Sequence, residues 1–155
     1  MNRSPRGLRF GFSKGGSPMN YPWIHGYLLA KPGVTVDYKQ EWNWVRYQLG
    51  GKLFAAVCLD DQDTPVYVTM KLLPARGDLL RQQFGDIIPG YYCNKVHWNS
   101  VKADGCVPDA LIKDMLDESY GLILNAFSKK RREEILSAPP QPPVDFGKDG
   151  YWNGK

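Results

Sequence analysis

Apolar and polar side chains alternate in the segment WVRYQL, residues 44–49, a pattern typical of a strand with one buried face. The glycine pair at 50–51 predicts a tight turn into the mostly apolar segment 52–59, and so a hairpin. The polar run at 60–65 predicts a second turn, and residues 66–72 a third strand. Together these segments predict an antiparallel meander.

Four other segments carry apolar residues at helical spacing. We predict a first helix within residues 19–30, a short second helix in 75–84 and a last one in 129–136, where Ser128 can cap the first turn. The longest helix is predicted to begin at Pro108. Its buried face would consist of Leu111, Ile112, Met115, Ser119, Leu122, Ile123 and Ala126. In the short helix the inward residues would be Leu79, Leu80 and Phe84.

Alternation returns in HWNSVKAD, residues 97–104, and predicts a further strand. We expect Trp98 and Val101 to be buried, because large aromatic and β-branched residues of a strand usually lie in the core. The segments together predict an α+β fold of two layers, in which helices pack on one face of a mainly antiparallel sheet.

The chain has 155 residues, with five Trp, nine Tyr and six Phe, which favours one folded domain with a substantial core. Residues 1–18 are basic and Gly-rich, and residues 137–155 are Pro-rich and then Gly-rich. We therefore predict a flexible basic arm at 1–18, a folded domain at 19–136 and a loose tail at 137–155. A basic, acid-free N-terminus is also found in organelle transit peptides, the alternative for the arm.

The net charge of +4 lies outside the predicted domain. Residues 1–20 and 137–155 contain six of the 20 basic and two of the 16 acidic residues, so the central segment carries 14 of each. A nucleic-acid-binding domain usually concentrates positive charge, because phosphate neutralisation dominates its affinity. Any DNA binding would therefore depend on a local patch.

The densest chemistry of the chain lies in PGYYCNKVHWNSV, residues 89–101. A metal site would need Cys93, His97 and the distant Cys106, and this spacing lacks a CxxC pair and a fourth ligand. A nucleophilic site would use Cys93 or Ser100 with His97 as its base, without a nucleophile elbow or a papain-like signature. We therefore predict neither a metal site nor a catalytic one.

Nucleic-acid binding is a further interpretation of the same segment. The candidate contact residues are Lys95, Asn94, His97, Asn99, Lys71 and Lys102. Lys52 and Arg46 would add charge, and Tyr91, Tyr92 and Trp98 could stack on bases. The structural alternative is that His97 and Asn94 satisfy backbone groups where the chain enters a strand, with Trp98 in the core.

Several segments in order resemble the MmcQ/YjbR family. They are LLAKPGVTVDY, GGKLFAAVCLD, PVYVTMKL, LLRQQFGDIIPGYYCNKVHWNSV and PDALIKDMLDESYGLI. The most specific are the NKxHW core at Asn94, Lys95, His97 and Trp98, and the KPG at 31–33. The resemblance spans residues 19–136 and implies a CyaY-like fold, also described as a double wing. It further implies DNA binding, and it implies no catalytic residue.

We therefore expect a DNA-binding protein that binds weakly and without sequence specificity through a local basic and polar surface. The alternative is a small module that binds a protein or a ligand without nucleic-acid binding or catalysis. An enzyme centred on His97 and Cys93 is a third hypothesis.

We expect no cofactor, no metal and a monomer. No apolar run approaches the ~20 residues of a membrane helix, so we expect no membrane partner. The three widely spaced cysteines are typical of a reducing cytoplasm.

Overall fold

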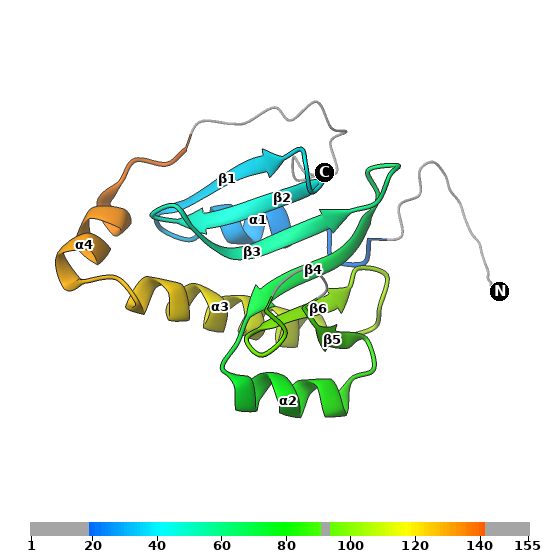
Figure 1. Ribbon diagram of the computed structural model, residues 1–155. Coiled ribbons are helices and arrows are strands. Elements are labelled where there is room, and N and C mark those ends of the chain that lie inside the picture. Colours follow the sequence, from blue (N-terminus) through cyan, green and yellow to red (C-terminus); the bar gives the residue numbers. More distant parts are fainter. Residues whose placement is uncertain (1–18, 91–93, 142–155) are drawn as a thin grey trace.

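The computed structural model describes residues 19–90 and 94–141. Within them, six strands form one antiparallel sheet in the order β1-β2-β3-β4-β6-β5 (Figure 1). The strands are Val34–Lys39 (β1), Trp44–Leu49 (β2), Lys52–Leu59 (β3), Pro65–Lys71 (β4), Ile87–Pro89 (β5) and Trp98–Lys102 (β6). The helices are Ile24–Leu29 (α1), Pro74–Gln83 (α2), Asp109–Asn125 (α3) and Lys129–Ser137 (α4). The predicted arm at 1–18 and most of the predicted tail lie outside the described residues.

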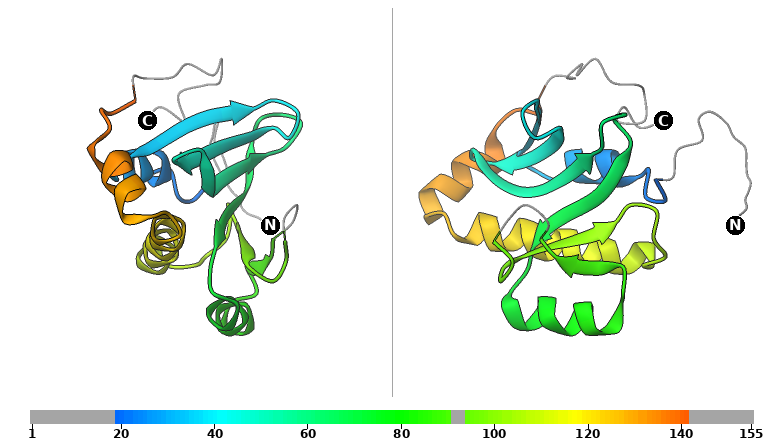
Figure 2. Two further views of the ribbon diagram at one scale, coloured as in Figure 1. Left: turned by 60° about the vertical axis from the view of Figure 1, so that its left-hand side comes forward. Right: turned by 45° about the vertical axis from the view of Figure 1, so that its right-hand side comes forward.

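The helices α1 and α3 pack on the same face of a strongly twisted sheet (Figure 2). α1 contacts β1, α3 contacts β3 and β4, and α2 packs against the edge strand β5. The main core lies between α3 and the sheet, and its members include Tyr47, Val68, Val101, Ile112 and Met115. This two-layer arrangement confirms the predicted α+β fold with helices on one face of an antiparallel sheet.

The predicted meander is present with its predicted faces. In β2, the side chains of Val45, Tyr47 and Leu49 are fully buried on the helical side. The turn into β3 uses Gly50 and Gly51, whose φ angles of 54° and 84° favour glycine. The hairpin prediction is therefore confirmed.

Two strands and one helix boundary differ from the prediction. β1 was not predicted, although Val34 and Val36 alternate with polar residues, and β5 is only three residues long and is defined by its pairing with β6. The first helix is limited to α1, shorter than the predicted 19–30. In α2, Leu80 is buried as predicted, but Leu79 is 48% exposed. Leu79 is one position, about 100°, away from the side that faces the sheet.

The sheet face opposite α1 and α3, here called the open face, is covered by no helix of the described chain. Two rows of directly paired residues cross this face from β1 to β6. The first row is Lys39, Trp44, Cys58, Tyr67 and Lys102, and the second is Asp37, Arg46, Ala56, Thr69 and Ser100. Trp44, Ala56 and Cys58 form a small second core there, packed by Leu53 and Tyr67.

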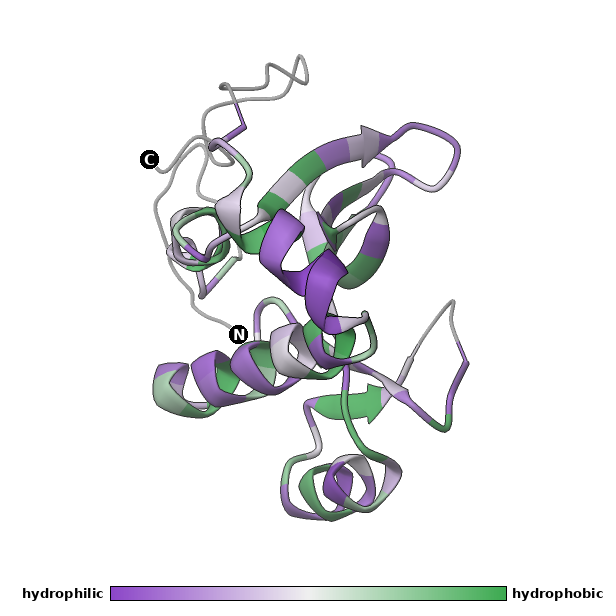
Figure 3. Cartoon of the chain, turned by 90° about the vertical axis from the view of Figure 1, so that its left-hand side faces the viewer, coloured by the Kyte–Doolittle hydropathy of each residue, from purple (hydrophilic) through white to green (hydrophobic). Residues whose placement is uncertain are grey.

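The helix α4 is hydrophilic along most of its length (Figure 3). Ser128 caps it as predicted, because its Oγ accepts a hydrogen bond from the Arg131 amide at 3.2 Å. Ile135 is its buried residue, and a Cβ on Gly33 or Gly50 would lie within 3 Å of the Ile135 side chain. α4 is therefore attached to the sheet through one apolar side chain that two glycines accommodate.

Candidate nucleic-acid interface

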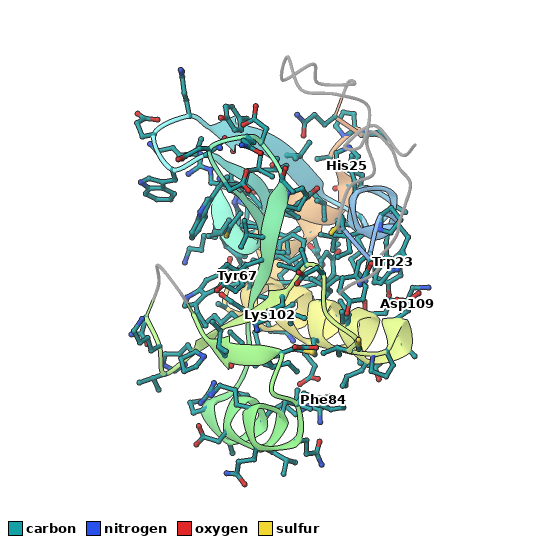
Figure 4. All side chains as sticks on the ribbon, turned by 90° about the vertical axis from the view of Figure 1, so that its right-hand side faces the viewer. Trp23, His25, Tyr67, Phe84, Lys102 and Asp109 are labelled. Carbon is teal, nitrogen blue, oxygen red and sulfur yellow. The ribbon has the colours of Figure 1, made fainter. Side chains whose placement is uncertain are left out.

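Two lysine–aromatic pairs lie on the open face of strands β4 and β6. Lys71 is the direct partner of Trp98 in the ladder, and Tyr67 is the direct partner of Lys102. Tyr67 and Lys102 lie next to each other, away from Trp23 and His25 of the helical side (Figure 4). The two pairs are four residues apart along each strand, which corresponds to about 13 Å. We call these four residues the β4–β6 surface.

Hydroxyl groups occupy the positions between the two pairs. Thr69 and Ser100 are directly opposite each other, and their hydroxyl oxygens are 2.9 Å apart. The thiol of Cys58 lies 3.6 Å from the Thr69 hydroxyl. All three side chains are buried. The two lysine–aromatic pairs are thus separated by Thr69 and Ser100, two small side chains that are hydrogen-bonded to each other.

The backbone of Lys71 is held by the helix α3 from the other side of the sheet. The hydroxyl of Ser119, fully buried, accepts a hydrogen bond from the Lys71 amide at 2.9 Å and donates one to the Phe54 carbonyl at 2.5 Å. Ser119 therefore satisfies two main-chain groups where the β3–β4 ladder ends. This contact fixes the end of β4 from which the Lys71 side chain extends.

A tight turn at residues 94–97 leads into β6 and contains three of the predicted site residues. The side-chain oxygen of Asn94 accepts hydrogen bonds from the amides of Val96 (2.8 Å) and His97 (3.3 Å), which gives Asn94 a structural role. The Lys95 ammonium donates to the Gly90 carbonyl at 3.1 Å and is otherwise exposed. The half-buried His97 accepts a hydrogen bond from the Leu72 amide through its carbonyl.

Asn99 lies in the interior, so the prediction that it contacts a nucleic acid needs correction. Its side chain is fully buried, accepts a hydrogen bond from Arg81 of α2 and donates one to the His97 carbonyl. It shares the helical side of the sheet with Val101, two positions further along the strand. Gly77 makes room for it, since a Cβ there would lie 2.9 Å from the Asn99 oxygen.

Trp98 is half-buried and belongs to neither apolar cluster of the described chain. The expectation that it anchors the core is therefore wrong, whereas Val101 is fully buried as predicted. The reason is the strand period, which points residues an odd number of positions apart to opposite faces. Trp98 thus lies on the open face, next to Lys71.

The candidate lysines differ from most arginines of the described chain in their charge partners. Lys71, Lys95 and Lys102 form no ion pair with a described residue, whereas Arg46 pairs with Asp37, and Arg76 with Glu118. Of the predicted contact residues, the structure thus brings Lys71 and Lys102 onto one surface and places Lys95 in the turn before Trp98. A lysine without an ion pair in the described part of the chain can attract phosphate.

A second basic group was not among the predicted site residues. The first turn of α4 carries Lys129, Lys130, Arg131 and Arg132, and only Arg131 forms an ion pair within the described chain, with Glu134 at 3.3 Å. Positive charge at a helix N-terminus opposes the helix dipole, so these residues contribute little to helix stability. The sequence signal was the basic run KKRR at 129–132, which two glutamates follow.

His25, on the helical side of the sheet, contacts a buried tyrosine. His25 Nδ1 lies 2.9 Å from the hydroxyl oxygen of the fully buried Tyr47. Burial lowers the pKa of His25 and raises the pKa of Tyr47 above its ordinary value.

Among the described residues, no group of three or more His, Cys, Asp or Glu side chains could hold a metal ion. Cys93 of the metal and nucleophile hypotheses lies outside the described residues, as do Tyr91 and Tyr92.

The helices of the described chain are all too short or too polar to cross a membrane. This finding concerns the described residues alone.

A protein-family model, YjbR, matches residues 29–122. The Escherichia coli K12 protein YjbR, described as uncharacterized, is 34% identical over 110 residues, which cover 71% of this chain and 92% of that protein. YbdF of E. coli O157:H7, also described as uncharacterized, is 28% identical over 89 residues, 57% of this chain and 71% of YbdF.

Solved structures share the fold. The crystal structure of Deinococcus radiodurans protein DR2400, described as a DUF419 domain, aligns with a TM-score of 0.67 and 26% identity over 86% of this chain and 98% of that one. A crystal structure of a Pseudomonas syringae protein aligns with a TM-score of 0.58 and 21% identity, covering 68% and 99%. The second likeness concerns the fold alone.

Proposed function

The chain belongs to the YjbR family, and we propose that this member binds DNA weakly and without sequence specificity through its β4–β6 surface and Lys95. The observation that carries the proposal is the group of three lysines without an ion pair in the described chain, two of them on the helix-free face of the sheet. Phosphate contacts by such lysines are independent of base sequence.

The weakness of the binding follows from the small number of cations. Three lysines that each neutralise one phosphate give a slope of log affinity against log salt of about −3. The rest of the domain adds little long-range attraction, because its basic and acidic residues are equal in number. Most of the affinity is therefore lost between low and physiological salt.

The experiment is a fluorescence-anisotropy titration of a labelled random duplex at several salt concentrations. We compare the parent chain with Lys71→Gln/Lys102→Gln, and with Lys129→Gln/Lys130→Gln in α4 as a matched control that removes the same charge. The proposal predicts that the first variant reduces the slope by about 2 and that the control changes affinity less. A larger loss in the α4 variant, or no binding by the parent at low salt, contradicts it.

The second candidate function is the binding of a partner protein, which two exposed apolar side chains favour. Leu73 and Val96 are 59% and 58% exposed. Each is the chain neighbour of one partner of the hydrogen bond that the Leu72 amide donates to the His97 carbonyl at 2.8 Å, at the end of the β4–β6 ladder. Exposed apolar side chains that gather in one region are typical of interaction sites. Retention of a partner protein that depends on Leu73 and Val96, in a chain that binds no DNA, would favour this function.

A further inference from the structure

We propose that the β4–β6 surface selects single-stranded nucleic acid over the duplex, with one unpaired base stacked on Trp98 and its phosphate on Lys71. The inference rests on the proposed function and names the form of nucleic acid that fits the same surface. Lys71 and Trp98 are direct partners in the ladder, so an amine and an aromatic ring are presented side by side.

An amine beside an aromatic ring can bind one nucleotide whose base is unpaired, because the amine binds the phosphate and the ring stacks on the base. Aromatic rings bind bases by stacking, and neighbouring lysines neutralise the backbone that links the bases. In a duplex the faces of the bases are covered by their neighbours, so a ring that lies on a sheet face has no base to stack on. A duplex would therefore use the lysines alone, whereas a single strand uses the ring as well.

The position of the surface in the sheet also disfavours a duplex. The major groove admits an α-helix or a two-stranded ribbon. Here β4 is flanked by β3, and β6 by β5, so the two strands lie inside a sheet and do not project. The helices α1 and α3 lie on the other face (Figure 2). No helix or two-stranded ribbon of the described chain is therefore placed on this face to enter a groove.

Another tryptophan, Trp42, can be compared with Trp98 as a stacking site. Trp42, in the turn between β1 and β2, is 52% exposed, and its ring lies 5.3 Å from the Trp44 ring of the open face. The cations above Trp42 are Lys39 at 5.3 Å and Arg46 at 5.9 Å. Glu41 and Asp37 pair with these two cations, whereas Lys71 has no such partner in the described chain. We therefore place the stacking site at Trp98.

The experiment measures the affinity of the 155-residue chain for labelled oligothymidine, for oligouridine and for a DNA duplex of equal length at low salt. We expect both single strands to bind about tenfold more tightly than the duplex. Trp98→Leu, which keeps an apolar side chain at the half-buried position, should lower single-strand affinity about tenfold and lower duplex affinity much less. Trp42→Leu is the matched control and should leave both unchanged.

A second variant covers the case in which Trp98→Leu unfolds. Lys71→Gln changes an amine and no core residue, and it should reduce the salt slope for the single strand by about 0.7. Duplex affinity equal to single-strand affinity in the parent overturns the inference and leaves the proposed function standing. Equal losses for Trp98→Leu and Trp42→Leu also overturn it. The absence of all binding at low salt overturns the proposed function as well.

Discussion

Lys71 and Trp98 are direct partners across strands β4 and β6, on the sheet face that α1 and α3 leave uncovered. Twenty-seven positions separate them in the sequence, and α2 and β5 lie between. The fold thus forms the lysine–aromatic pair by bringing together two distant segments. Trp98 faces the open side because Asn99 and Val101 face the interior.

The half-buried position of Trp98 sets its contribution to stability. Trp98→Ala should lower the free energy of unfolding by about 1–2 kcal/mol, because part of the ring's apolar area is already exposed. Trp44→Ala, at a side chain 3% exposed in the small second core, should cost about 3–5 kcal/mol. Urea unfolding of both variants checks this, and equal losses would show that Trp98 is a core residue.

The Ser119 hydroxyl should matter for the end of β4. Ser119→Ala leaves the Phe54 carbonyl and the Lys71 amide without their partner, which should cost about 1–3 kcal/mol. Hydrogen exchange gives a local test. The Lys71 amide should lose protection in the variant, and unchanged protection would mean that another acceptor satisfies it.

Two helical glycines should respond in opposite directions to alanine. A Cβ on Gly77 would lie 2.9 Å from an Arg81 nitrogen and from the Asn99 oxygen, so Gly77→Ala should break the partly buried hydrogen bond between these side chains and cost about 1–2 kcal/mol. Gly121 of α3 has no atom within 4 Å of its Cβ position, and Gly121→Ala should stabilise by about 0.5–1 kcal/mol. Thermal unfolding compares them. Stabilisation by both substitutions would exclude the packing argument for Gly77.

The lowered pKa of His25 predicts a loss of stability in mild acid. Burial lowers the pKa of His25 in the folded chain, so between that value and about 6.5 the unfolded chain binds more protons. Stability contributed by the neutral imidazole is therefore present above pH 6.5 and is lost as pH falls below it. Urea unfolding between pH 5.5 and 7.5 should show a shallower dependence on pH in His25→Gln. Identical dependence in parent and variant would rule out this role.

Much of the fold could be predicted from the sequence, because its hairpin and its longest helix each form within one short segment whose residue pattern is sufficient to identify it. Alternation in residues 44–49 and the glycine pair at 50–51 gave the β2–β3 hairpin, and helical spacing gave α3. β5 could not be found in this way, because three residues carry no period and the strand exists through its pairing with β6.

The site was predictable only in part. Lys71, Lys95 and Lys102 could be chosen as candidates from residue type, but their lack of ion pairs depends on where the acidic residues fold. The burial of Asn99 depends on Arg81, which reaches it from another element. The position of Trp98 could have been inferred, since its parity within the strand is opposite to that of Val101.

The central claim is that nucleic acid contacts the β4–β6 surface, and the most direct test is the mapping of amide and indole signals by NMR during titration with a short single strand. We predict that the Trp98 indole signal and the amides of Lys71 and Lys102 shift together. The signal of the Trp23 indole, whose nitrogen is buried on the helical side, should not shift. Shifts confined to Lys129 and Lys130 of α4, with the Trp98 indole unmoved, would contradict the account.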